Sequence, residues 1–209
     1  MRALVLGGCT LAAVWLGPLP ELAQRSFAAH MTMHMAVVAV AAPLIAIGLA
    51  GLRWDPVRRF PALFAPIPAS IVELVVVWLW HAPLLHHAAR HVLFARVLEQ
   101  GTFLASGLLL WLSVLGGDAK TRDSRRGSGV LALLLTSMHM TLLGALLALP
   151  PRALYGHAGV DDAASLDDQH WGGAIMLVVG GLVYLLGGLW LAAQLLRADA
   201  AAARKGRLT

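Results

Sequence analysis

Two histidines and three methionines occur within six consecutive residues, in the stretch HMTMHM at positions 30–35. His30 and His34 are four residues apart, so on a helix their imidazoles lie on the same face and can converge on one ion. Met31 and Met35 repeat that spacing on an adjacent stripe. Imidazole nitrogen and thioether sulfur together suit Cu(I) better than magnesium, calcium or manganese. The stretch indicates a copper site, while hydrogen bonding between helices is the alternative use of such a histidine pair.

Two further stretches carry histidines that a metal site in a helical bundle can use. In WLWHAP at 78–83, Pro83 loosens a helix just past His81. His81 is therefore either a ligand level with the first pair or a member of the interfacial aromatic belt. A second histidine–methionine stretch comprises Met138, His139 and Met140. Core or lipid-facing filler remains the alternative role for each methionine.

The carboxylates give fewer candidates. In LDDQHWGG at 166–173, Asp168 is the plausible acidic ligand, although Asp167 and Asp168 also suit the positive end of a helix dipole. His170 follows in the same stretch. Glu73 falls well inside an expected span, where an acid is either functional or paired with a neighbouring helix. The sequence leaves both roles of Glu73 open.

The composition indicates that these residues lie in a membrane. Of 209 residues, 59% are hydrophobic and 13% are charged, and the mean hydropathy is +0.74. A soluble domain needs far less apolar surface, so the net charge of +5 does not indicate nucleic-acid binding. A single cysteine, Cys9, excludes an internal disulfide and a multi-cysteine metal cage. The sequence has no phosphate loop, G-x-S-x-G or H-E-x-x-H motif, so we expect no enzyme.

The apolar stretches predict an all-α fold, a polytopic membrane protein with a bundle of six transmembrane helices, because about 20 apolar residues cross the hydrocarbon core. The expected helices are about 3–18, 27–49, 67–86, 97–116, 129–149 and 171–194. They form a single transmembrane domain at 1–196, followed by a basic cytoplasmic tail at 197–209. The first stretch has some features of a signal peptide, but the residues after it lack a small-x-small cleavage site and favour a retained helix.

The basic residues predict the orientation of the bundle. With both termini in the cytoplasm, twelve of the sixteen Lys and Arg residues fall on the inner side, as the positive-inside rule requires. The same map places His139 near the midplane and the other eight histidines in the outer half or the outer loops. Those eight are His30, His34, His81, His86, His87, His91, His157 and His170. This segregation indicates a function at the outer side, although the 86–91 run is expected to be a solvated interfacial stretch.

The order of these motifs resembles the CtaG family of caa3-type cytochrome c oxidase assembly factors, over nearly the whole length of the chain. HMTMHM is similar to the family's H-M-x-x-H-M helix, and WLWHAP to its W-H-x-P segment. LLGALL, PRALY and LDDQHWGG are similar to its L-L-G-A-L-L, P-x-x-L-Y and D-Q-x-x-x-G stretches. Each motif is short, and their shared order makes the resemblance specific.

The resemblance implies a protein of the cell inner membrane that assembles a haem–copper oxidase by handling or delivering copper to its catalytic subunit. The implied partners are that oxidase subunit and a periplasmic copper chaperone, with the histidine-rich side facing the periplasm or exterior. The residues that match the family pattern are His30, His34, His81, His139, Asp168 and Gln169. Two positions depart from it: Gln100 stands where a histidine is expected, and His170 where a second glutamine is expected.

The residues and the resemblance together give one expected ligand set for copper as Cu(I). Its members are His30, His34, His81, His139, Met35, Met138, Met140, Asp168 and His170. A b-type haem protein, with histidines from facing helices as axial ligands, is an alternative that the methionine enrichment disfavours. A cofactor-free scaffold for oxidase assembly is the other alternative.

The charge asymmetry gives a topology prediction. Reporter fusions after Arg59 and Arg126 are expected to report the cytoplasm, and fusions near His91 and Gly159 the outer side. Paired alkaline phosphatase and fluorescent-protein fusions measure this directly. An inverted pattern would put the histidines in the cytoplasm and contradict copper delivery at the outer side.

Overall fold

The computed structural model describes residues 1–155 and 161–206, apart from the side chains of Asp199 and of residues 201–206. All regular secondary structure in this described part is helical. The elements are α1 Arg2–Leu16, α2 Leu19–Leu22, α3 Phe27–Met35, η1 Ala36–Ala41, α4 Ala42–Leu49, α5 Pro56–Arg59, η2 Pro61–Leu63, α6 Pro66–Trp80, α7 Pro83–His91, α8 Leu93–Leu115, α9 Ala119–Ala148, α10 Asp162–Ile175, η3 Met176–Gly180 and α11 Gly181–Gly206. The all-α prediction is confirmed.

The prediction of six spans is supported only in part. Within the described residues, four helical stretches are long and apolar enough to cross a membrane: Phe27–Leu49, Leu93–Leu115, Ala119–Ala148 and Asp162–Ala198. The pair α6 and α7 gives a fifth if the two helices, bent by 73°, count as one broken span. The 15-residue α1 is apolar but short, at about 22 Å against a core of about 30 Å. It ends where Gly17 leaves the helical conformation and Pro18 follows.

Local chemistry explains where the helix boundaries differ from the expected ones. The break after Trp80 comes before Pro83, which opens α7 as its first residue and cannot continue α6. Asp118 caps α9 by accepting a hydrogen bond from the backbone N–H of Thr121 at 2.8 Å. Because of this cap, α9 begins at Ala119, ten residues before the helix that the apolar pattern predicts at 129. These first residues of the helix are mostly polar.

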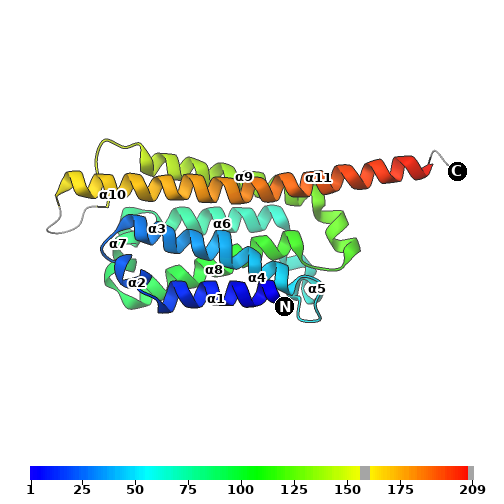
Figure 1. Cartoon of the computed structure of the whole chain (residues 1–209), viewed down its shortest axis with the longest axis horizontal. Coiled ribbons are helices and arrows are strands. Elements are labelled where there is room, and N and C mark those ends of the chain that lie inside the picture. The colour runs from blue at the N-terminus through cyan, green and yellow to red at the C-terminus, as the bar shows by residue number, and fades with distance from the viewer. Residues whose placement is uncertain (156–160, 207–209) are drawn as a thin grey trace.

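The helices pack as an elongated bundle (Figure 1). α10, η3 and α11 form one long rod beside α9, while α6 packs against both α8 and α9, and α1 packs against α4. The start of α1, the short α5 and the end of α11 lie at one end of the bundle. α2, α7 and the start of α10 lie at the other end. We call these the α5 end and the α7 end.

Two π-helical segments, η1 and η3, interrupt the long spans near the middle of the bundle. A π-turn shifts backbone carbonyls out of the regular ladder and frees them for other donors. In η1 the carbonyl of Val38 accepts from Trp111 Nε1 at 3.1 Å and from Tyr184 Oη at 3.3 Å. The same hydroxyl lies 2.6 Å from Glu73 Oε1, so its single proton is shared between the Val38 carbonyl and the carboxyl group, which is the nearer acceptor. Glu73 is therefore paired with a neighbouring helix, which was one of the two roles that the sequence left open.

Glycines allow α9 to approach the α10–η3 rod at backbone distance. A Cβ added at Gly144 would lie 2.6 Å from the backbone nitrogen of Leu177, and one at Gly173 would lie 2.4 Å from that of Ala148. Such close approach is how small residues hold transmembrane helices together, through van der Waals contact between backbones. By contrast, a Cβ at Gly101 on α8 would meet nothing within 4 Å.

This packing predicts unequal effects of the same substitution. Gly144→Ala is expected to lower the melting temperature of the purified protein by about 2–10 °C, because overpacking costs about 1–3 kcal/mol. Gly101→Ala is the matched control and should be neutral or slightly stabilising, since alanine is the better helix former. Thermal unfolding in detergent measures both. Equal melting temperatures for the two variants would contradict the tight α9–η3 contact.

Candidate metal site

Five side chains that can bind a metal meet near the α7 end of the bundle. They are His30 and His34 from α3, His81 just after α6, His86 from α7 and Glu99 from α8. Their relative exposures are 3%, 0%, 4%, 2% and 1%. Groups from α3, α7 and α8 and from the end of α6 therefore meet in one buried region, and we call these five residues the histidine cluster.

The positions of the first two histidines follow from how α3 begins. Ser26 caps the helix by accepting a hydrogen bond from the backbone N–H of Ala29 at 3.1 Å. With the helix started there, the i, i+4 spacing of His30 and His34 places both on the inner face. The ring of Phe103 on α8 packs against His34, with centroids 4.0 Å apart. Neither histidine faces outward.

His81 is held in a defined orientation by the break between α6 and α7. Its Nδ1 lies 2.6 Å from the carbonyl oxygen of Val77. A carbonyl only accepts, so Nδ1 carries the proton and Nε2 keeps a lone pair for a ligand. Tyr155 donates from its hydroxyl to the His81 carbonyl. Burial raises the pKa of Tyr155 to about 12, so this donor keeps its proton at physiological pH.

The cluster consists of two overlapping groups that share His30. In the first, one ligand atom each from His30, His86 and Glu99 lie within 4.8 Å of one another, and His30 Nε2 is 3.9 Å from Glu99 Oε1. The second group lies one helical turn further along α3. There the ring centroid of His81 is 6.0 Å from that of His30 and 5.4 Å from that of His34.

Several buried atoms of the cluster make no hydrogen bond to any described residue. They are His30 Nε2, His81 Nε2, Glu99 Oε1 and both ring nitrogens of His34. Leaving a polar atom buried without a partner costs about 1–3 kcal/mol. Each neutral imidazole keeps one nitrogen with a free lone pair. Such nitrogens, converging from different helices beside a carboxylate oxygen, form an arrangement that a bound cation can stabilise.

Residues at the rim orient and cover the cluster. Gln100 donates from Nε2 to Glu99 Oε2 at 3.2 Å and accepts from Trp15 Nε1 of α1, also at 3.2 Å. The residue that replaces the expected family histidine therefore positions a carboxylate of the cluster. Arg90 donates to the carbonyl of Gln24 from both Nε and Nη2 and ties α7 to the segment before α3.

Comparison with known proteins identifies the family. The sequence model described as cytochrome c oxidase caa3 assembly factor (Caa3_CtaG) matches residues 2–198. The chain belongs to this family. Neither the curated proteins nor the solved structures include a significant match. The resemblance inferred from the motifs is thus confirmed, and the protein is a member of a family of oxidase assembly factors.

The family stretch at 168–170 joins loops and helices in this assembly factor. Asp168 accepts from Ser26 Oγ at 2.7 Å and from the backbone N–H groups of Phe27 and Ala28, so it completes the cap of α3. Gln169 accepts from Leu154 N and donates to the carbonyl of Leu147. His170 Nε2 lies 2.9 Å from the carbonyl of Pro150. Asp168 and His170 are both occupied by contacts outside the cluster.

The second histidine–methionine stretch is divided between two environments. Met138 is 67% exposed on the outer surface of α9. His139 is buried, and with Met138 and Ser137 it borders a groove beside α6. Met140 and Met35 instead both pack against Gly180 in η3. His139 makes no ring contact with the histidine cluster, but it is close enough to interact electrostatically with His34. Both of its ring nitrogens are buried without a hydrogen-bond partner among the described residues.

Sequence reasoning missed two members of the cluster. The sequence predicts a solvated run at His86, but the bend after His81 turns α7 back so that His86 is buried against Phe27, His30 and Tyr155. Glu99 was not singled out, although an acid within an apolar span is a functional candidate by the argument applied to Glu73. His157 lies outside the described residues.

The contacts of Asp168 predict a structural effect of its removal. Asp168→Ala should destabilise the protein by about 2 kcal/mol, because hydrogen bonds to a charged acceptor are lost. For a chain of this size the shift is about 4–8 °C in melting temperature. The control is Asp167→Ala, a substitution of the exposed neighbouring residue, which should change the melting temperature little. If Asp168→Ala left stability intact but abolished copper binding, the carboxylate would be a ligand and not a cap.

Proposed function

We propose that this assembly factor binds Cu(I) in the histidine cluster and transfers it to the catalytic subunit of a caa3-type oxidase. The observation that carries the proposal is the convergence of His30, His34 and His81, from two spans, with buried ring nitrogens that have no hydrogen-bond partner among the described residues. Membership of an oxidase assembly family supplies the recipient. In this proposal copper is the substrate that the protein transfers, and not a permanently bound cofactor.

The donor set suits a copper ion that must later be released. Neutral imidazoles are good ligands for copper, but three of them alone would leave its charge uncompensated in a region of low dielectric. Glu99 supplies one negative charge, at 3.9 Å from His30 Nε2. One carboxylate balances the single charge of Cu(I) and leaves a second charge on Cu(II) uncompensated. The cluster therefore favours the reduced ion.

The shared position of His30 supports a stepwise path for the ion. Copper entering near Glu99 and His86 would already be bound by His30, which also faces His81. Exchange of one ligand at a time keeps the ion coordinated throughout the passage. A chaperone of this type holds its cargo through replaceable ligands rather than in a closed four-ligand cage.

The size of the site argues against the haem alternative. The cavity bordered by His30, Met33 and Glu99 measures about 10 Å³. A volume of that order holds one ion or one water molecule, whereas a porphyrin requires several hundred cubic ångströms of the kind found in cofactor pockets. The scaffold alternative needs no ligand, and metal analysis separates it from the copper proposal.

The proposal predicts the effect of removing the ligands. His30→Ala/His34→Ala should weaken Cu(I) binding at least about tenfold, since even residues that only support metal ligands contribute 10–100-fold. Competition of the purified protein with a chromophoric Cu(I) chelator measures this. Cells carrying the double variant should lose oxidase activity in copper-limited medium and regain part of it when copper is added. The amount of protein in the membrane should be near normal.

An exposed histidine of α7 provides the control. His87→Ala removes an imidazole that contacts His91 and lies outside the cluster, so it should leave binding and oxidase activity unchanged. Full oxidase activity of the double variant under copper limitation would show that the pair is structural. If the purified wild-type protein bound no Cu(I) while still supporting oxidase assembly, the scaffold alternative would replace the copper proposal.

A further inference from the structure

A cavity of about 370 Å³ is lined by residues of α4, α8, α9 and α11. These elements meet toward the α5 end of the bundle, whereas the histidine cluster lies near the α7 end (Figure 1). The cavity is formed where α4 and α8 end and α9 begins, beside the middle of α11. The volume falls in the range of pockets that hold small molecules. Neither the oxidase assembly family nor the copper proposal gives this cavity a role.

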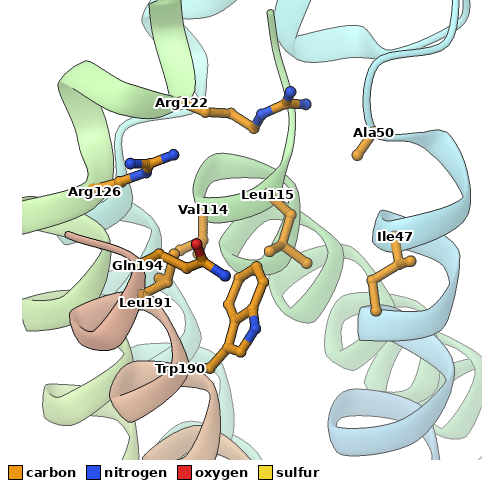
Figure 2. Close-up of a pocket in the computed structure, with 9 residues that line it drawn as sticks. All are labelled: Ile47, Ala50, Val114, Leu115, Arg122, Arg126, Trp190, Leu191 and Gln194. Carbon is orange, nitrogen blue, oxygen red and sulfur yellow. The ribbon is translucent and has the colours of Figure 1, made fainter. Parts of the chain in front are cut away.

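One end of the cavity is cationic. The guanidinium groups of Arg122 and Arg126, one turn apart on α9, extend over the opening, with the amide of Gln194 from α11 below Arg126 (Figure 2). Arg122 donates from Nη1 to the carbonyl of Gly117, and no described carboxylate lies within ion-pair distance of it. Arg126 pairs with Asp123 through Nη2 at 2.8 Å, a surface contact of small energy. Most guanidinium N–H groups are thus available to an anion.

The opposite end of the cavity is apolar. Val114 and Leu115 from the end of α8, with Trp190 and Ile47, form its walls (Figure 2). The indole of Trp190 is 54% exposed, as is usual for tryptophan at the level of lipid headgroups. These residues belong to stretches that are apolar enough to lie in a membrane. The cavity therefore changes from cationic to apolar where the spans meet the interface.

We propose that this cavity binds an anionic phospholipid, with the phosphate between Arg122 and Arg126 and the upper acyl chain along Leu115 and Trp190. Arginine recognises phosphate oxygens through paired N–H donors, and basic pockets between membrane helices are typical sites for anionic headgroups. The apolar walls favour a lipid over a free phosphate ion or a soluble nucleotide, which would leave them unused. The lipid would bridge four elements, α4, α8, α9 and α11.

The charge asymmetry of the sequence agrees with this assignment. The α5 end carries Arg53, Arg58 and Arg59 as well as the two cavity arginines. Basic residues of this kind accumulate on the side of the membrane whose leaflet is rich in anionic lipid. A phospholipid from that leaflet reaches the cavity without crossing the bilayer.

Lipid titration of the purified full-length protein in a neutral detergent tests the proposal. Dimyristoylphosphatidylglycerol and dimyristoylphosphatidylcholine have the same acyl chains and differ in charge, and native mass spectrometry measures the affinity for each. The phosphatidylglycerol should bind the wild-type protein more tightly and raise its melting temperature. Arg122→Gln/Arg126→Gln should weaken its binding about 25-fold, at about fivefold for each arginine near a phosphate.

A matched variant controls for net charge. Arg53→Gln/Arg59→Gln removes two exposed arginines from the same end of the bundle, where they stack on Trp54 and Phe60 outside the cavity. It should bind phosphatidylglycerol as the wild type does. Circular dichroism shows whether the double cavity variant folds. If it does not, the single variants Arg122→Gln and Arg126→Gln test the proposal, and each should lower the affinity for phosphatidylglycerol about fivefold.

Three results would overturn the proposal. They are equal affinity for the two lipids, an unchanged affinity of the cavity variants, and an equal loss in the control variant. Inorganic phosphate is tested alone as well. If it binds through the two arginines and displaces the lipid, the cavity is a site for free anions and the lipid proposal is wrong. Copper binding is measured on the same samples and should not change, so failure here is distinct from failure of the copper proposal.

Discussion

Polar atoms inside a bilayer cannot hydrogen-bond to water, so each one needs a partner within the protein. Several buried polar groups of the bundle have such partners. Glu73 is bonded by Tyr184, Ser70 by Thr136, and the freed carbonyl of Val38 by two donors from other helices. Other buried atoms have no hydrogen-bond partner among the described residues, among them Glu73 Oε2, Trp78 Nε1 and both ring nitrogens of His139. What distinguishes the unbonded nitrogens of His30, His34 and His81 is that their rings lie together. This convergence of unbonded ring nitrogens is the feature on which the proposed copper site rests.

Much of the fold and part of the site could be predicted from sequence. The long apolar stretches predict the all-α fold, and the four-residue spacing of His30 and His34 predicts that both lie on one face of a helix. Pro83 marked the break next to His81. The direction that the chain takes after this break cannot be predicted from the sequence. Only the 73° bend turns α7 back over the cluster, and it is this bend that buries His86.

The remaining differences come from tertiary contacts that one-dimensional patterns do not contain. Asp168 has the residue type of a ligand, but the start of α3 lies beside it and uses both carboxylate oxygens. Met138 and Met140 are two residues apart and therefore face different sides of α9, one exposed and one buried. Gln100 lacks the expected imidazole, yet it orients the carboxylate of Glu99. Residue type alone therefore does not show which neighbour a side chain contacts in the folded bundle.

The π-helical segment η1 has an evolutionary consequence. Each residue of an α-helix turns the chain by about 100°, and η1 lies between α3, which carries His30 and His34, and α4, which is packed against α1 and α8. Deleting one residue from Ala36–Ala41 would restore a regular helix and rotate both imidazoles away from His81. Insertions and deletions in this segment should therefore disrupt the cluster, and because Val37, Val38 and Ala41 are fully buried, only substitutions that keep side-chain size should be tolerated. Divergent descendants of this chain should keep the length of that segment and the small or branched apolar type of its buried residues.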